Sequence, residues 1–160
     1  MIRLATNDDV PGILDLIGRV YAEYGDKVCT DPGGAEFDLL DIQANYQQPG
    51  GQFWVLDLAG QIKGTHATRP DESNRDVCGF RRLYLEQALR GTTDWGHQLM
   101  QITIDWASEK RFQRVEFWSD TRFERAHKFF TKFGFEHDGR VREMTDSFET
   151  YSEYFFSLTL

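Results

Sequence analysis

The chain has 160 residues, of which 40% are hydrophobic and 28% are charged, and this composition excludes a disordered chain. Its 18 Lys and Arg against 26 Asp and Glu give a net charge of −8, which argues against a general nucleic-acid binder, because such proteins need a basic face. No run reaches the roughly 18 uncharged apolar residues that a membrane span requires. We therefore expect a single domain over residues 1–160, with no nucleic-acid partner and no membrane partner.

The spacing of cysteine and histidine indicates neither a disulfide framework nor a metal site. Cys29 and Cys78 lie far apart and lack CxxC spacing, so we interpret both as reduced thiols of a cytoplasmic protein. The first residues carry no long apolar core of a secretory signal, which agrees with that location. The 4 histidines show no HExxH or Cys/His ligand pattern, so we predict no metal.

The first third of the chain predicts one short strand followed by two helices. Ile2–Leu4 is an apolar run suited to a strand, and helix-capping side chains follow at residues 6–8. Apolar residues at helical spacing over 10–24 predict the first helix, which Gly25 ends. A second, weaker helix is expected over 35–46.

The middle of the chain predicts three strands. Residues 52–58 and 62–68 form two apolar runs on either side of an Ala-Gly turn, so they are expected to pair as a hairpin. A polar loop follows, and residues 80–85 predict a third strand.

The last part of the chain predicts a helix over 95–110, a strand over 115–118 and a Phe-rich helix that ends at Gly134. Two final strands are expected over 135–141 and 154–160.

This element order favours an α/β (α+β) fold. We predict a mixed, mostly antiparallel twisted sheet of about six or seven strands, with about four helices on both faces. The central β-α-β unit over 80–118 requires a right-handed crossover if its two strands share a sheet.

The segment over 82–99 changes from a strand, through a turn-rich loop, to a helix start. Such a loop presents unpaired N–H groups and the positive end of a helix dipole, which together suit a phosphate. Arg90 adds a cation, and Gly91 and Gly96 permit close backbone approach. Many joints of this kind bind nothing, so the segment alone leaves phosphate binding open.

Three segments resemble the GNAT acetyltransferase superfamily. The segment with which these enzymes bind acyl-CoA is similar to RRLYLEQALRGTTDWGHQLM. Their next strand and helix are similar to RVEFWSDTRFERAHKFFTKFGFEHDGR, and their first strand and helix to IRLATNDDVPGILDLI. The resemblance covers nearly the whole chain and is most specific over residues 80–140.

The resemblance implies a GNAT-like fold in which two parallel strands, here 81–85 and 115–118, separate and admit the pantetheine arm of coenzyme A. It implies that acetyl-CoA is the acyl donor and that the acetyl group passes directly to a primary amine of a small molecule or a protein. The cofactor-binding residues that it implies are Leu83, Leu85, Arg90, Gly91, Thr92, Thr93, Gly96 and His97.

Two positions depart from the family pattern. The phosphate loop lacks its usual glycines, because Thr93 and Trp95 stand at the expected positions when counted from Arg90, and Asp94 stands at one of them in the alternative count. Phe130 stands where many members carry the Tyr that protonates the departing thiolate, and Phe cannot donate a proton. The general acid is therefore absent or supplied elsewhere.

Three side chains are candidates for proton handling. His127 lies one turn from Phe130 and has a suitable intrinsic pKa, Tyr84 ends the central strand, and Asp120 follows the strand over 115–118, where open α/β sheets place ligands. Each has a structural alternative: a surface histidine, a packed tyrosine and a helix cap, respectively. Acidic residues over 21–51 either favour a cationic amine or form a solvated face.

Other functions stay open beside the transferase. Phe130 and the irregular loop motivate a non-catalytic acyl-CoA-binding or sensing module, and Asp94 motivates a GNAT-shaped protein that has lost cofactor binding and works through protein contacts. GNAT domains often pair, and an exposed last strand could form a homodimer.

Overall fold

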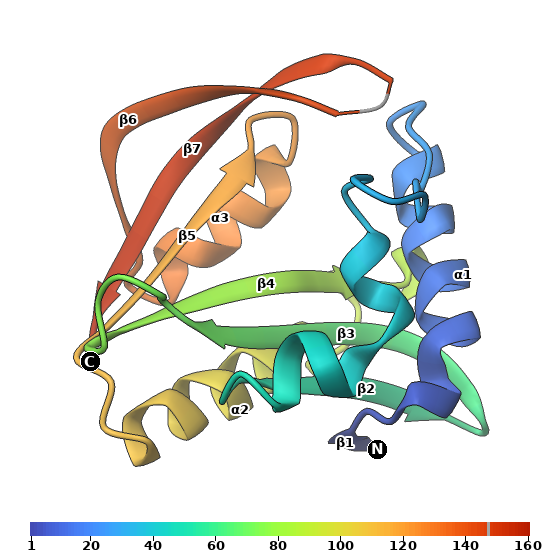
Figure 1. Ribbon diagram of the computed structural model, residues 1–160, viewed down its shortest axis with the longest axis horizontal. Helices are drawn as coiled ribbons and strands as arrows, with labels where there is room; N and C mark the ends of the chain where they lie inside the picture. Colours follow the sequence, from blue (N-terminus) through green and yellow to red (C-terminus); the bar gives the residue numbers. More distant parts are fainter. Residues whose placement is uncertain (147) are drawn as a thin grey trace.

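The computed structural model describes residues 1–146 and 148–160, and its seven strands form one sheet (Figure 1). The strands are β1 (Ile2–Leu4), β2 (Gln52–Leu58), β3 (Gln61–Pro70), β4 (Val77–Leu85), β5 (Arg114–Asp120), β6 (Glu136–Thr145) and β7 (Thr150–Thr159). Their order across the sheet is β1-β2-β3-β4-β5-β7-β6. β4 and β5 pair in parallel and the other neighbours pair antiparallel, which confirms the predicted mixed sheet.

The α-helices are α1 (Val10–Ala22), α2 (Trp95–Glu109) and α3 (Glu124–Lys132). Within the described residues, no helix is long and apolar enough to cross a membrane.

One hydrophobic core lies between α1 and the first strands. The buried stripe of α1 contributes Ile13, Leu16 and Ile17, which cluster with Phe53 of β2 and Ala67 of β3. The helix starts with a proline in its first turn, where the missing N–H has no helical partner to lose. This core fixes α1 on one face of the sheet.

A second core covers the other face under α2 and α3. Met100 of α2 and Phe130 of α3 cluster with Phe80 of β4, Val115 of β5 and Phe156 of β7. Because the two cores lie on opposite faces, the sheet separates α1 from α2 and α3 (Figure 1).

The parallel pair separates soon after it begins. β4 and β5 pair only over Val77–Gly79 and Arg114–Glu116, and beyond these residues the strands diverge. A register shift between β3 and β4 falls in the same region, at Arg82, whose φ of 60° is unusual for a residue with a side chain. The divergence opens a gap in the sheet between the two cores.

The structure corrects the prediction of one helix over 35–46. That stretch holds a 3₁₀ turn, η2 (Phe37–Leu40), and a π-helical turn, η3 (Gln43–Gln47). Asp41 between them is extended, and its carboxylate accepts the backbone N–H of Ala44 at 2.9 Å. Asp41 therefore caps the start of a new turn and does not continue a helix from η2. β4, β6 and β7 also extend beyond their predicted ranges.

Candidate functional site

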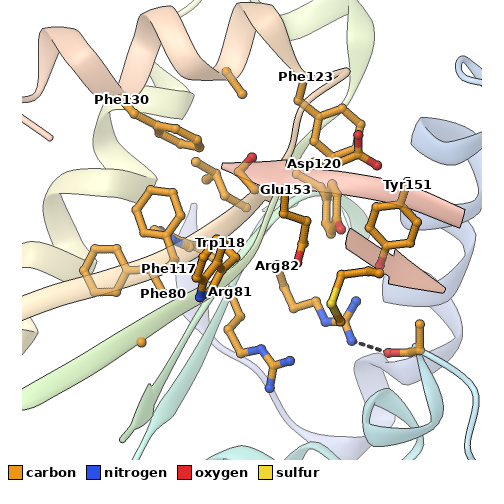
Figure 2. A pocket seen from close by; sticks show the side chains of 18 of the residues that line it. Phe80, Arg81, Arg82, Phe117, Trp118, Asp120, Phe123, Phe130, Tyr151 and Glu153 are labelled. Atoms are coloured by element: carbon orange, nitrogen blue, oxygen red, sulfur yellow. Dashed lines mark hydrogen bonds between the residues drawn. The ribbon is translucent and has the colours of Figure 1, made fainter. Parts of the chain in front are cut away.

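A cavity of about 520 Å³ lies in the gap between β4 and β5 (Figure 2). Met100, Phe117, Ala126 and Phe130 line it from the side of α2 and α3. Tyr21, Glu36, Arg82, Tyr84, Phe123 and Tyr151 are among the residues that line it elsewhere, from the side of α1, η2 and the β6–β7 hairpin. The cavity therefore joins the two faces of the sheet.

The apolar wall of the cavity offers no proton donor at Phe130. This side chain is buried, and its ring lies 4.8 Å from that of Phe117 and 5.4 Å from that of Phe156, both edge-on. The aromatic cluster thus fixes the Phe130 ring in the cavity wall.

The opposite wall carries a hydrogen-bonded chain. The hydroxyl of Tyr84 lies 3.0 Å from that of Tyr21, and the Tyr21 hydroxyl donates to Oε1 of Glu36 at 2.9 Å. Glu36 is only 3% exposed, and its other carboxylate oxygen accepts the backbone N–H of Cys29 at 2.8 Å. Burial holds the pKa of the Tyr21 hydroxyl well above its ordinary value, and the neighbouring Tyr84 adds to this rise.

Arg82 fastens η2 beside this wall. Its guanidinium donates to Oδ1 of Asp38 at 2.8 Å, to the Ala35 carbonyl at 2.7 Å and to the Tyr46 hydroxyl at 3.2 Å. Its Nη1 lies 3.8 Å from Glu36. The bulge at Arg82 thus brings a buried cation to the segment that supplies Glu36.

The loop that precedes α2 presents free backbone donors. Within the described chain, the N–H groups of residues 91–97 donate no hydrogen bond to the protein, while Gln98 N–H starts the helical pattern on the Asp94 carbonyl. The hydroxyls of Thr92 and Thr93 instead turn back to the carbonyls of residues 88 and 89 at 2.9 and 2.7 Å. The loop therefore has the hydrogen-bond donors that an anion site needs, and the two threonine hydroxyls stabilise its backbone conformation.

Arg90 is engaged by the protein. Its Nη atoms donate to both carboxylate oxygens of Glu23 at 2.8 and 2.7 Å, and its Nε donates to the Leu85 carbonyl at 2.8 Å. Arg90 therefore ties the loop to α1 and covers a carbonyl that the resemblance assigned to the acyl donor.

Arg125 of α3 brings another cation to the loop. Its Nη2 lies 2.6 Å from the position that a Cβ would take on Gly91, whose φ is +70°. No acidic side chain among the described residues pairs with the exposed Arg125. Gly96 lies beside Leu85 and Phe129, and the His97 ring lies 4.7 Å from the Phe133 ring at a tilt of 36°, so both face the joint between α2 and its neighbours.

His127 lies outside the residues that line the cavity. Its Nε2 is 3.1 Å from the Ser119 hydroxyl, and its ring packs against Tyr154 and Phe156 of β7. Burial lowers the pKa of His127 below its ordinary value. The surroundings favour a neutral, packed imidazole.

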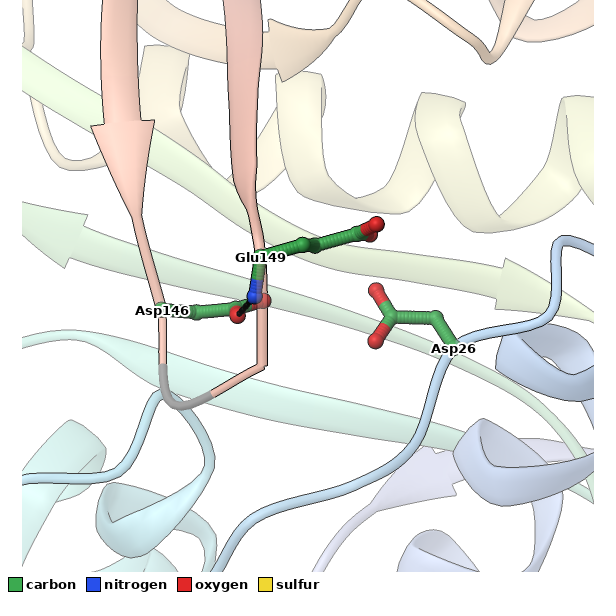
Figure 3. Close-up of side chains that lie close together, drawn as sticks. All are labelled: Asp26, Asp146 and Glu149. Atoms are coloured by element: carbon green, nitrogen blue, oxygen red, sulfur yellow. Dashed lines mark hydrogen bonds between the residues drawn. The ribbon is translucent and has the colours of Figure 1, made fainter.

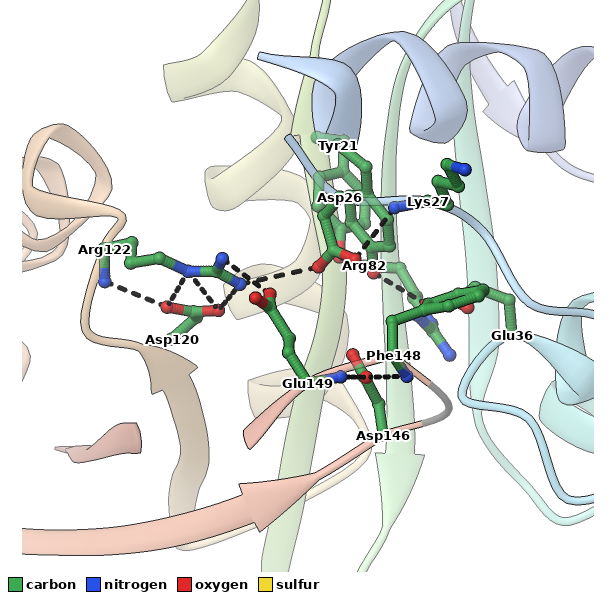
Figure 4. A network of polar contacts seen from close by, with 11 residues as sticks. Tyr21, Asp26, Lys27, Glu36, Arg82, Asp120, Arg122, Asp146, Phe148 and Glu149 are labelled. Carbon is green, nitrogen blue, oxygen red and sulfur yellow. Dashed lines mark hydrogen bonds and ion pairs between the residues drawn. The ribbon is translucent and has the colours of Figure 1, made fainter. Parts of the chain in front are cut away.

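Asp120 lines the cavity but is neutralised by Arg122. The guanidinium of Arg122 donates to both carboxylate oxygens, at distances of 2.7 to 3.1 Å, and it also reaches Glu149 at 2.8 Å and Asp26 at 3.5 Å (Figure 4). Asp120 also accepts the backbone N–H of Arg122. This network joins the β5–α3 turn to the end of α1 and to the β6–β7 hairpin.

Three carboxylates meet at the rim of the cavity, namely Asp26, Asp146 and Glu149, with oxygens within 4.8 Å of one another (Figure 3). Asp146 accepts the backbone N–H groups of residues 148 and 149, and Arg122 supplies the positive charge to the other two. The group is a charge network of the protein with its own counterion.

The comparisons with known proteins identify the family. Residues 49–137 match the family model described as the acetyltransferase (GNAT) domain, which is more than half of the chain. The chain belongs to the GNAT acetyltransferase family. The curated Escherichia coli K12 protein named "Uncharacterized N-acetyltransferase YjgM" is 33% identical over 94 residues, which are 57% of this chain and 55% of that relative. This chain therefore matches about half the length of that relative.

Solved GNAT structures share the fold over nearly all of the chain. An acetyltransferase of the GNAT family from Staphylococcus aureus Mu50 superposes with a TM-score of 0.81 at 19% identity, covering 99% of this chain and 98% of that one. An acetyltransferase from Streptococcus agalactiae 2603 superposes with a TM-score of 0.80 at 22% identity, covering 100% and 98%. These likenesses confirm the predicted GNAT-like fold.

The sequence reasoning missed three residues of the candidate site. Tyr21 fell within the apolar stripe of α1, and Glu36 was one of several acidic residues in a segment of uncertain structure. Arg125 lay inside the segment that resembles the family, but nothing in its spacing pointed to the loop before α2. Only the folded chain brings Tyr21 and Glu36 to Tyr84, and Arg125 to Gly91.

Proposed function

We propose that this protein transfers an acetyl group from acetyl-CoA to a primary amine of a small molecule or a protein. The observation that carries the proposal is the cavity in the gap between β4 and β5, which gives two reactants access to one point from opposite faces of the sheet. Membership of the GNAT family supports the same reaction.

The donor would bind along the gap and at the loop before α2. β4 beyond Gly79 has no partner strand on its β5 side, so backbone groups near Leu83 are available to the pantetheine arm, whereas the Leu85 carbonyl accepts a hydrogen bond from Arg90 and would have to be released first. The free N–H groups of residues 91–97 would hold the pyrophosphate at the start of α2. Arg125 would add the cation, because Arg90 is already bound by Glu23.

The reaction joins the amine nitrogen to the thioester carbon and breaks the carbon–sulfur bond, whose electron pair leaves with sulfur. Holding the two reactants in line supplies about 7–11 kcal/mol in well-oriented cases. The thiolate is a fairly good leaving group, so Phe130 need not abolish turnover.

The charge of the cavity supports a cationic acceptor. Carboxylates outnumber guanidinium groups among its lining side chains. The carboxylates are Asp26, Glu36, Glu116, Asp120, Asp146 and Glu153, and the guanidinium groups are those of Arg81, Arg82 and Arg142. Arg122 and Arg114, which lie outside the lining, pair with Asp120, Asp26 and Glu116 and reduce this excess, and the remaining negative charge would draw an ammonium group toward the gap.

A non-catalytic acyl-CoA-binding or sensing module is the second candidate, and Phe130 is the observation that favours it. The cytoplasmic location, the homodimer and the single domain over 1–160 stay predictions.

Calorimetric titration with acetyl-CoA, followed by an assay of thiol release across a panel of amines, tests the proposal. Binding together with amine-dependent release supports the transferase. Binding without release from any amine supports the sensing module, and absence of binding contradicts both.

A further inference from the structure

We propose that Tyr84, Tyr21 and Glu36 form a proton relay that takes a proton from the acceptor nitrogen as it attacks the thioester. The inference rests on the proposed transferase function and names residues that act in it. Tyr84 is the catalytic residue that touches the acceptor, and Tyr21 and Glu36 are positioning residues that act through it.

The hydrogen bonds set the direction of the chain. The Tyr21 hydroxyl donates its hydrogen to Glu36 at 2.9 Å. In its 3.0 Å contact with Tyr84, the Tyr21 oxygen must therefore be the hydrogen-bond acceptor. Tyr84 therefore donates its own hydrogen to Tyr21. The remaining lone pair of the Tyr84 oxygen is then available to accept a proton from a group in the cavity, which both tyrosines line.

The alternation of β4 places this oxygen on the acceptor side of the gap. Leu83 packs in the core under α2 and α3, whereas Tyr84 packs against the core under α1. Both residues lie beyond Gly79, where β4 has parted from β5. A donor held along β4 would thus lie beside Leu83, with the Tyr84 hydroxyl on the opposite face.

Glu36 is suited to end the relay. It is buried, and the charged and titratable side chains near it include Tyr21, Arg82 and Tyr151, while its second carboxylate oxygen accepts the backbone N–H of Cys29. The Arg82 guanidinium is 3.8 Å away and makes its close contact, 2.8 Å, with Asp38. Glu36 therefore stays a hydrogen-bond acceptor without a close ion pair.

The step balances within the chain. As the amine nitrogen bonds to the acyl carbon it becomes far more acidic, and it gives a proton to the Tyr84 oxygen. Tyr84 passes its proton to Tyr21, and Tyr21 passes its proton to Glu36. The carbon–sulfur bond then breaks with its electron pair on sulfur, and coenzyme A leaves as the thiolate, which takes a proton from water. Glu36 gives its proton back to water through the same chain when the product leaves, so the relay needs no acid at Phe130.

The experiment compares wild type with Tyr84→Phe, Tyr21→Phe, Glu36→Gln and the double variant of Tyr84→Phe with Glu36→Gln. Putrescine, spermidine and phenethylamine serve as acceptor probes, and thiol release and acetyl-CoA affinity are both measured. Each single variant should lower kcat about 100-fold, the scale of general-base catalysis, with KM for acetyl-CoA unchanged. The double variant should have the same kcat as the single variants, because either substitution alone already interrupts the proton relay.

Tyr24→Phe is the matched control, since Tyr24 is exposed at the end of α1, packs on Phe123 and lies outside the cavity lining. It should keep the wild-type kcat. Tyr21→Phe removes the middle hydroxyl of the relay, so the relay can still be tested if Glu36→Gln fails to fold.

Wild-type kcat in folded Tyr84→Phe or Tyr21→Phe, or losses that add in the double variant, would overturn the relay and leave the transferase standing. Acetyl-CoA binding by wild type without thiol release from any probe would overturn the relay and the transferase together.

Discussion

Replacement of Arg125 by alanine tests the assignment of the cation at the loop before α2. Its guanidinium lies over Gly91, among N–H groups that have no protein partner, and no carboxylate of the described chain competes for it. A hydrogen bond to a charged group contributes about 1.5–3 kcal/mol, and because Arg125 is exposed we take the lower value, which weakens acetyl-CoA binding about tenfold.

Calorimetry with acetyl-CoA at low and moderate salt measures this loss, and the variant should also show a weaker salt dependence. Arg75→Ala is the matched control, because it removes the same charge from the exposed loop at the other end of β4. Wild-type affinity in Arg125→Ala, together with a large loss in Arg90→Ala, would refute the reasoning. That result would mean that Arg90 leaves Glu23 to bind the pyrophosphate.

Three further predictions concern stability. Gly91→Ala places a side chain at a φ of +70° and against Arg125, so urea denaturation should show a loss of about 1 kcal/mol or more and calorimetry weaker acetyl-CoA binding. Phe130→Ala should lower the free energy of unfolding by about 3 kcal/mol, the low end for a buried Phe because a cavity already adjoins it. Burial lowers the pKa of His66 to about 4, below its ordinary value of 6.5. The free energy of unfolding is therefore unaffected by this group above pH 6.5, and it falls by about 3 kcal/mol as the pH drops to 4, because the unfolded chain binds the proton first. Denaturation of His66→Asn across this range should show a smaller decline.

The elements of the fold were readable from the sequence because their signals are local. Apolar periodicity located α1, α2 and the hairpin of β2 and β3, and Gly134 marked the end of the helix that contains Phe130. The prediction of one helix over 35–46 was wrong, because the carboxylate of Asp41 caps a new turn there. A competing side-chain hydrogen bond of that kind leaves no trace in hydrophobic spacing.

The candidate site was harder to predict because its contacts are long-range. Arg90 could be chosen as a cation from its place in the loop, but its pairing with Glu23 joins residues 67 positions apart. Tyr21 and Tyr84 are separated by 63 positions, and only the packing of α1 on the sheet brings their hydroxyls together. The loop before α2 and the strand β4 could be predicted from the sequence, but the hydrogen-bond partners of their polar groups depended on the fold.

Asp94 was the strongest sequence argument that the loop had lost its anion, and its surroundings weaken that argument. Asp94 is exposed and makes no capping hydrogen bond, so its carboxylate stays in water. Two unit charges 4 Å apart in water interact by only about 1 kcal/mol, and salt reduces this further. The free N–H groups of residues 91–97 and the guanidinium of Arg125 act in the opposite direction and within the loop itself. The charges and free donors at this helix start are therefore consistent with the proposed anion site, in which Arg125 of α3 would supply the cation.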